Sequence, residues 1–395
     1  MSAHSSLDFA QRQIEIDRAI IGSDAPLTAR KLKKIGASPL GFFRGSAPLY
    51  YEILAADKSL QLETVDVGHV VGDMHLENVG AYRTDADEIT FDLNDFDDSA
   101  QAPLWVDRLR VAVSVLLAAR AFDASAQAAL GLVYELLGAY DDALAGAPPP
   151  ALPKPIVGLV ERARKRSRKA LLDMRAPVVN GRRKFLRGER YLDIPAHDLA
   201  ELPAMIDAYR ASLGARAPAH ASSWTTIDVA TRVAGTGSLG RKRFAFIVAD
   251  ADGIERMFEL KEAAPSSVEG LIGAQGSEPS ERVVGAAHSL ALSAPRQLAA
   301  LGVTKLGSFI GRKLCPEEDK LDLAQLHVGP KLSSVVRVVG ALLGHAHARD
   351  AGGVKRTIPR DNEELVDRAV LLAGVFYSVY LAHARLVSRS ENTTS

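Results

Sequence analysis

Residues 227–261 read IDVATRVAGTGSLGRKRFAFIVADADGIERMFELK, and they contain three apolar runs typical of consecutive β-strands. The runs lie at 227–233, 244–248 and 257–261. The second connection, Asp250–Gly253, has the composition of a hairpin turn. We therefore expect three antiparallel strands, in a chain whose other long segments read mostly as helices.

The first connection, Gly235–Gly240, has the pattern G-x-G-x-x-G. A dinucleotide-binding fold would place a helix after these glycines, whereas residues 241–248 continue as a strand, so that interpretation fails. A glycine-rich loop between antiparallel strands is instead typical of the flap that covers the phosphates of ATP in kinases. On this interpretation the phosphate-binding residues are Gly235, Gly237, Ser238 and Gly240.

Lys261 lies on the third predicted strand, 21 residues beyond the last glycine. An ammonium group at this place can meet the α- and β-phosphates of a nucleotide, and an ordinary surface lysine is the alternative. A carboxylate on the following helix should orient the lysine. Glu281, 20 residues further on, fits best, and Glu269 is the second choice.

An acidic motif precedes this region in the chain. Residues 70–80, VVGDMHLENVG, follow a predicted strand at 65–71 and place Asp73 and Asn78 five residues apart on one loop. A carboxylate there can accept a proton from a hydroxyl group, and a carboxamide oxygen can ligate a hard cation.

A second acidic motif, residues 91–98, reads FDLNDFDD and follows a predicted strand at 88–92. Its four acidic residues lie within seven positions, which is costly unless a metal ion or a cationic ligand neutralises them. An acidic turn in which Asp92 or Asn94 caps a helix is the alternative. Because the two acidic motifs follow adjacent strands, together they favour one shared site.

Taken together, the motifs resemble the protein-kinase-like superfamily, particularly its aminoglycoside and choline phosphotransferase branch. The catalytic loop of that branch reads G-D-x-H-x-x-N, as residues 72–78 do, and its metal loop reads I-D-F. The resemblance implies that Asp73 is the catalytic base and that Asn78 and Asp95 hold a metal ion. Asp92 competes with Asp95 for the metal and is kept as a second ligand.

The order of the motifs departs from that of ordinary kinases, in which the glycine flap and its lysine come first. A circular permutation explains this order, since permutation is tolerated where the old termini lie close together at the surface. Val71 also stands where the family has His or Arg. Residues 105–109, WVDRL, resemble the segment that ties down the catalytic loop in those enzymes.

We therefore expect an α+β protein with a circularly permuted, protein-kinase-like two-lobe fold. Residues 1–224 would form the catalytic helical lobe and residues 225–315 a small antiparallel β lobe. Residues 316–395 would form a helical segment that packs on the large lobe.

The whole chain also resembles the uncharacterised bacterial domain-of-unknown-function 2252 family, which brings no established activity. The segments that carry this likeness are 38–45, 72–80, 91–98 and 345–348.

Composition narrows the classes of function. The chain has 395 residues, with 48 Lys and Arg against 48 Asp and Glu, so its formal net charge is zero. A nucleic-acid-coating protein is usually more basic, so we expect no nucleic-acid partner. The single cysteine, Cys315, excludes an internal disulfide and a cysteine-based zinc cluster.

The hydropathy pattern predicts no membrane segment. Residues 1–10 lack the apolar core of a signal peptide, and the longest uncharged apolar run, 369–384, has 16 residues. That run is too short to span a bilayer. We expect it to be a buried C-terminal helix, with no membrane partner and a cytoplasmic location.

The segment 161–190 is strongly basic, with twelve Lys and Arg against three acidic residues. A solvated helix face followed by a loop is one interpretation, and a patch for a phosphorylated or polyanionic partner is the other. Two further residues stay open. Arg44 could bind phosphate or pair with acidic side chains, and Arg312, near the expected hinge, could line the nucleotide pocket.

The function expected from these residues is an ATP- and Mg²⁺-dependent phosphotransferase that acts on the hydroxyl group of a small molecule. Three alternatives stay open. They are nucleotidyl (AMP) transfer by the same residues, a nucleotide-binding regulatory protein without catalysis, and a polyanion-binding module built on residues 161–190.

Overall fold

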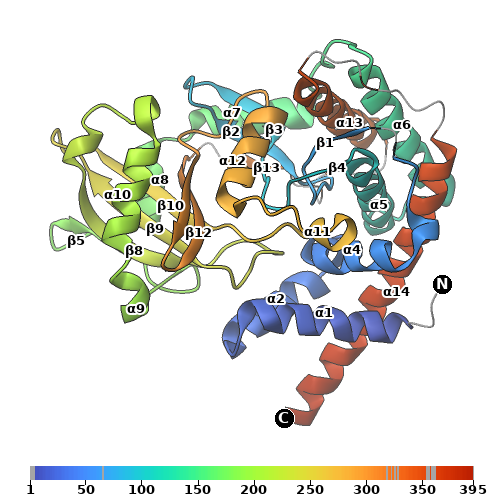
Figure 1. Cartoon of the computed structure of the whole chain (residues 1–395), viewed down its shortest axis with the longest axis horizontal. Coiled ribbons are helices and arrows are strands. Elements are labelled where there is room, and N and C mark those ends of the chain that lie inside the picture. Colours follow the sequence, from blue (N-terminus) through green and yellow to red (C-terminus); the bar gives the residue numbers. More distant parts are fainter. Residues whose placement is uncertain are drawn as a thin grey trace.

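The computed structural model describes residues 5–64, 66–316, 319–321, 323, 326, 329–352, 356 and 362–394. It combines many helices with antiparallel sheets, which confirms the α+β class. Figure 1 shows a large sheet at one end of the molecule and a helical part at the other, with short strands and helix α12 between them.

Four short helices begin the chain. Polar N-caps start the first three: Ser5 forms a capping box with Asp8, the Asp24 side chain accepts from the Leu27 amide, and Ser38 caps the third helix. The third and fourth helices meet at Ser46, because a new helix starts there with a proline in its first turn. The helices are α1 (Ser6–Ile21), α2 (Ala25–Gly36), α3 (Pro39–Gly45) and α4 (Ala47–Ala56), and a 3₁₀ turn at Lys58–Leu60 follows.

Short strands carry the two acidic motifs. β1 pairs with β4, β2 forms a hairpin with β3, and β13 adds to the free edge of β2. The first acidic motif follows β1 and the second follows β3. The predicted strand at 65–71 begins at Val65, which lies outside the described residues. The strands are β1 (Val67–Val70), β2 (Val79–Arg83), β3 (Ile89–Leu93), β4 (Ala100–Pro103) and β13 (Asp319–Lys320).

Long helices form the main core. α5 is buried on nearly every side, and its sequence is largely apolar after Arg110, whereas α13 packs along α6. These helices are α5 (Trp105–Ala121), α6 (Ala126–Leu144), α13 (Pro330–Asp350) and α14 (Glu363–Thr394).

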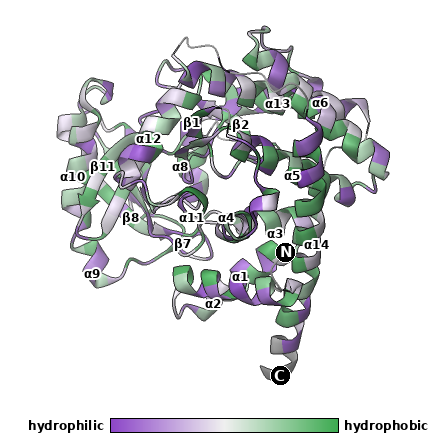
Figure 2. Cartoon of the chain, turned by 45° about the vertical axis from the view of Figure 1, so that its right-hand side comes forward, coloured by the Kyte–Doolittle hydropathy of each residue, from purple (hydrophilic) through white to green (hydrophobic). Residues whose placement is uncertain are grey.

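Helix α14 is less buried than its sequence predicted. One face packs against α5 and α1, whereas Val370, Leu371 and Leu381 are exposed. Figure 2 shows a largely apolar helix whose C-terminal end extends past the other elements. By length and composition alone, Glu363–Arg389 could cross a membrane, and 22% of its most apolar window lies buried. One such helix is weak evidence, so the absence of a membrane partner stays a prediction.

The middle of the chain leads from the helical part to the sheet. The basic segment 161–190 forms the end of α7, all of α8 and the small hairpin β5–β6. The elements are α7 (Lys154–Lys165), α8 (Arg168–Arg175), β5 (Val178–Val179), β6 (Arg182–Arg183), α9 (Ala196–Leu199), α10 (Leu202–Ser212) and 3₁₀ turns at Gly214–Arg216 and Ala221–Ser223.

The large sheet has the order β11-β12-β10-β9-β8-β7, and every pairing is antiparallel. It contains the three strands predicted within 227–261. The helix that follows the three strands and carries Glu281 ends at Leu290, and the next strand begins at Ala299. The elements are β7 (Tyr191–Leu192), β8 (Thr225–Arg232), β9 (Arg243–Ala249), β10 (Glu255–Glu262), α11 (Glu269–Ile272), α12 (Pro279–Leu290), β11 (Ala299–Thr304) and β12 (Gly307–Lys313).

The two faces of this sheet differ in character, because side chains alternate along each strand. One face packs against α10 and is aromatic, with Phe246 stacked on Phe258 at a centroid distance of 5.3 Å. On the other face, Glu259 lies opposite Arg312, and Lys261 lies opposite Arg243. The charged residues of several strands therefore share one face.

Candidate functional site

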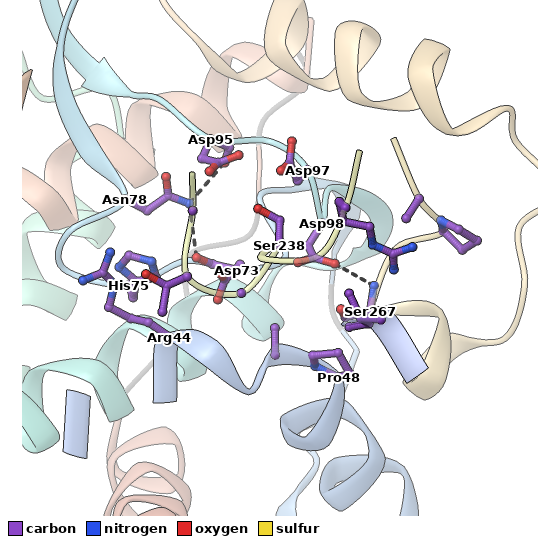
Figure 3. A pocket seen from close by; sticks show the side chains of 18 of the residues that line it. Arg44, Pro48, Asp73, His75, Asn78, Asp95, Asp97, Asp98, Ser238 and Ser267 are labelled. Atoms are coloured by element: carbon purple, nitrogen blue, oxygen red, sulfur yellow. Dashed lines mark hydrogen bonds between the residues drawn. The ribbon is translucent and has the colours of Figure 1, made fainter. Parts of the chain in front are cut away.

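The glycine turn and the two acidic motifs meet at one cavity of about 160 Å³, which we call the outer cavity. Asp73, Asn78 and Asp95 line it together with Gly235–Ser238, and Figure 3 shows Ser238 among the acidic side chains. These segments are some 160 positions apart along the chain, and the fold brings them together at this cavity.

Helix α5 fixes the backbone before Asp73 through hydrogen bonds. The buried carboxylate of Asp107 accepts hydrogen bonds from the amides of Val71 (2.6 Å) and Gly72 (2.9 Å). Gly72 has a φ of 79°, and a Cβ there would overlap the carbonyl group of Asp98. The expected tie between 105–109 and the loop that carries Asp73 is therefore confirmed, and Asp107 makes it.

Asp73 faces the cavity with a quarter of its side chain exposed, and Arg110 holds it from behind. Nε of Arg110 donates to Oδ1 of Asp73 at 2.9 Å, and its guanidinium lies over the Phe43 ring, 4.3 Å from the centroid. Burial raises the pKa of Asp73 to about 6; Arg110 opposes this effect, and Asp98 adds to it. Asp73 is thus a carboxylate that can exchange a proton near neutral pH.

Asn78 joins the two acidic motifs. Its Nδ2 donates to the carbonyls of Asp73 and Asp95, both at 3.1 Å, which fixes the orientation of the carboxamide. Its Oδ1 is buried and has no hydrogen-bond partner among the described residues, although Asn78 lines the cavity. An unpaired buried acceptor beside the Asp95 carboxylate fits a hard cation.

Asp92 does not reach this site, so the second metal ligand suggested by the sequence is wrong. It lies inside strand β3 and accepts from the amide of Leu292 at 2.7 Å, with Arg349 at 3.7 Å. Burial raises its pKa. Asp95 lies beyond the strand end, where the loop turns toward the cavity, and its side chain is 43% exposed.

Lys261 lines a second, adjoining cavity that is described below, and 6% of its side chain is exposed. It forms ion pairs with Asp97 and, at 3.5 Å, with Asp95. Burial and the neighbouring Asp95 raise the pKa of Asp97, and Lys261 opposes this shift. The lysine is therefore oriented by the second acidic motif.

The expected pairing of Lys261 with Glu281 is wrong, and Glu269 does not replace it. Glu281 is exposed in the first turn of α12. The neighbouring Arg282 points inward and donates to the carbonyls of Asp97 (2.9 Å) and Ser99. Because successive residues on a helix point about 100° apart, Glu281 is turned away from the cleft.

The glycine turn is clamped by α1 and α2, a contact that the sequence did not predict. Lys31 Nζ donates to the Gly237 carbonyl at 2.9 Å, and Lys34 Nζ donates to that of Gly235 at 2.6 Å. Gly240 has a φ of 104°, and a Cβ there would come within 3.0 Å of Ile21. The turn therefore approaches α1 too closely for any side chain.

A second cavity of about 250 Å³ adjoins the first and shares Asp95, Asp97 and Gly235 with it. We call it the inner compartment. Its cationic lining residues are Arg232, Arg243, Lys261 and Arg312. Arg312 thus lines the cleft, as the sequence suggested.

Glu259 lies beneath the inner compartment and is wholly buried. It pairs with Arg232, with Arg312 at 3.3 Å and with Arg243 at 3.8 Å. Burial alone would raise the pKa of Glu259, but the arginines outweigh it and hold the pKa far below its usual range. No local motif predicts this cluster, since its members come from four strands.

Arg44 and two buried histidines, His75 and His347, have structural partners. Arg44 lines the outer cavity but pairs with Glu77, and the His75 ring accepts from the Glu77 amide at 3.1 Å. His347 is buried between Tyr140 and Asp107. Within the described ranges, no group of three or more His, Cys, Asp and Glu side chains could hold a metal ion, so a metal held here would need ligands from Asn78 or a substrate.

Comparisons with known proteins give one match. The model of the family described as "Uncharacterized protein conserved in bacteria (DUF2252)" matches residues 24–374. No curated protein and no solved structure matches the chain.

Proposed function

The chain belongs to the DUF2252 family of uncharacterized proteins conserved in bacteria, and from its cleft we propose that it is an ATP- and Mg²⁺-dependent phosphotransferase acting on a hydroxyl group. The observation that carries the proposal is the meeting of the glycine turn with Asp73, Asn78 and Asp95 at one cavity. The hydroxyl acceptor is most simply a small molecule, by analogy with the enzymes that the motifs resemble.

The order of elements in the sheet part supports a circularly permuted kinase-like fold. The glycine turn joins the first two of three consecutive antiparallel strands, β8, β9 and β10. The lysine lies on the third, and helix α12 follows. Protein kinases place a glycine-rich loop, a strand lysine and a helix in the same succession.

In the proposed reaction, Asp73 orients the acceptor hydroxyl and accepts its proton. Both contacts from Arg110 reach Oδ1 of Asp73, so neither of them occupies Oδ2. The hydroxyl oxygen forms a bond with the γ-phosphorus, the bond to the bridging oxygen breaks, and ADP leaves. With a pKa of about 6, the carboxyl group is mostly ionised above neutral pH.

The remaining residues would hold the phosphates. Asn78 Oδ1 and the Asp95 carboxylate would hold Mg²⁺, which neutralises phosphate charge when bound. Lys261 would exchange its contact with Asp97 for the phosphate oxygens, and the backbone of the glycine turn would cover them.

The inner compartment favours nucleotidyl transfer as a second candidate. Its four cationic side chains, three of them arginines, match phosphate groups, and apolar side chains such as Tyr82, Phe96 and Ile310 line it beside them. Pro48, Ile20 and Ala47 give the outer cavity an apolar wall, which could hold a nucleoside. A nucleotide bound with its triphosphate inward would present the α-phosphorus to the acceptor, and pyrophosphate would leave.

Product analysis separates these candidates. The purified chain is incubated with Mg²⁺, a pool of bacterial small molecules and ATP labelled at either the α- or the γ-phosphate. Phosphotransfer moves the γ-label to the product and releases ADP, whereas nucleotidyl transfer moves the α-label and releases pyrophosphate. Glu281→Gln, outside the cleft, is the matched control for Asp73→Asn. If neither label moves in the parent chain and it binds no nucleotide, the proposal fails.

A further inference from the structure

Five cationic side chains surround a cavity outside the nucleotide cleft. This cavity, of about 520 Å³, lies where the far end of the large sheet meets the β2–β3 hairpin. Its cations come from α8, the 3₁₀ turn after α10, β10, the segment before β11 and β12. They are Arg168, Arg216, Arg256, Arg296 and Lys313, and we call the cavity they line the cationic cavity.

Acidic side chains compensate only part of this charge. Arg256 pairs with Asp250 at 2.5 Å, Arg296 with Asp87, and Arg216 lies 3.6 Å from Asp85. Asp85 is also the one acidic residue among the described residues that line the cavity.

Two of the five cations have no carboxylate partner in the described part of the chain. They are Arg168, which is exposed, and Lys313, which is half-buried. Burial lowers the pKa of Lys313; the nearby Cys315 opposes this shift, whereas the guanidinium groups of Arg296, Arg168 and Arg256 add to it. Holding like charges together at a half-buried place costs free energy unless an anion binds between them.

We propose that the cationic cavity binds a small anion carrying two or more phosphate groups, of which inorganic pyrophosphate is the simplest. Arginine forks and a lysine ammonium are the donors that phosphate oxygens prefer. No aromatic side chain lines the cavity among the described residues, so it offers no surface on which a nucleobase could stack. The cavity shares no lining residue with the outer cavity or the inner compartment, so this site is independent of the proposed transfer reaction.

Calorimetric titration of the whole chain with pyrophosphate, in buffer without divalent cations, tests the proposal. Lys313→Met removes the unpartnered ammonium and keeps the apolar stem, and we expect affinity to fall about tenfold or more. Arg168→Gln, at an exposed position, should weaken binding in the same direction even if Lys313→Met folds poorly. Arg164→Gln is the matched control, because Arg164 is an exposed residue of the same basic segment that does not line the cavity.

The outcomes separate this site from the cleft. Binding that survives Lys261→Ala and Arg164→Gln but is weakened by Lys313→Met and Arg168→Gln supports the proposal. Absence of binding at millimolar pyrophosphate overturns it, as does equal weakening by Arg164→Gln or abolition by Lys261→Ala.

Thermal unfolding without anion adds an independent readout. Relief of like-charge repulsion should give Lys313→Met a higher melting temperature than the parent. Saturating pyrophosphate should then raise the melting temperature of the parent more than that of the variant. If the variant without anion melts at a lower temperature than the parent, the inference that like charges repel one another in the cationic cavity is wrong.

Discussion

Replacement of Asp73 by asparagine should change how the stability of the chain depends on pH. The folded chain raises the pKa of Asp73 from 3.8 to about 6. Between these two values the folded state binds more protons than the unfolded state, so this group makes stability fall as pH rises. A carboxamide side chain does not titrate, so the variant should lack this fall.

The expected magnitude follows from the size of the shift. At 1.36 kcal/mol per pH unit, the rise from 3.8 to about 6 corresponds to about 3 kcal/mol. About 2 kcal/mol of this contribution to stability is lost as the pH rises from about 4.5 to about 7.5. The free energy of unfolding of Asp73→Asn minus that of the parent should therefore increase by about 2 kcal/mol across this range.

Urea unfolding at a series of pH values measures this difference. Because only its change with pH is compared, the constant effect of altering the partner of Arg110 cancels. Asp193→Asn, whose side chain is 91% exposed, is the matched control. A difference that does not change with pH for Asp73→Asn would refute the reasoning that burial in the cleft sets the proton affinity of this carboxyl group.

Three other substitutions test the cleft. Asn78→Leu removes the unpartnered carboxamide oxygen, so any Mg²⁺-dependent transfer should fall about 100-fold or more, measured as turnover against Mg²⁺ concentration; unchanged Mg²⁺ dependence would contradict its role as a ligand. Gly72→Ala places a methyl group against the Asp98 carbonyl at a positive φ and should cost about 3 kcal/mol or more in urea unfolding, whereas a neutral effect would contradict the described loop. Lys31 also forms an ion pair with the buried Asp17. Lys31→Met leaves this carboxylate without its cation and should lower the free energy of unfolding by about 3 kcal/mol, measured in the same way, with a smaller loss at low pH. No loss of stability at any pH would refute the buried ion pair.

The local patterns of the sequence predicted the strands and the loops of the site. The three strands at 227–261 were predicted from short apolar runs and turn residues, which are signals that extend over only a few positions. All three strands are present in the large sheet. Asp73 and Asn78 are fixed by spacing on one loop, so their common location followed from the sequence.

Contacts between distant segments could not be predicted in this way. Arg110 reaches Asp73 across 37 positions from the middle of a buried helix, where an apolar residue would be expected. The clamp of α2 on the glycine turn depends on Lys31, which reads as a surface lysine in the sequence. The choice between Asp92 and Asp95 depends on where strand β3 ends, and strand ends are the least certain part of a sequence pattern.

The choice of Glu281 failed for a related reason. Helix α12 was expected, but its rotation about its own axis was not determined by the pattern. Rotation of the helix by the angle between two successive residues places Arg282, instead of Glu281, on the face toward the cleft. Lys261 is instead oriented by its ion pair with Asp97 of the second acidic motif.

Calorimetric titration of the full chain with ATP and Mg²⁺ tests the central claim most directly. One binding site is predicted for the parent chain and for Glu281→Gln, with affinity reduced about tenfold or more in Asp95→Asn and in Lys261→Ala. Absence of binding in the parent, or equal affinity in all four proteins, would contradict a nucleotide cleft formed by the glycine turn and the two acidic motifs.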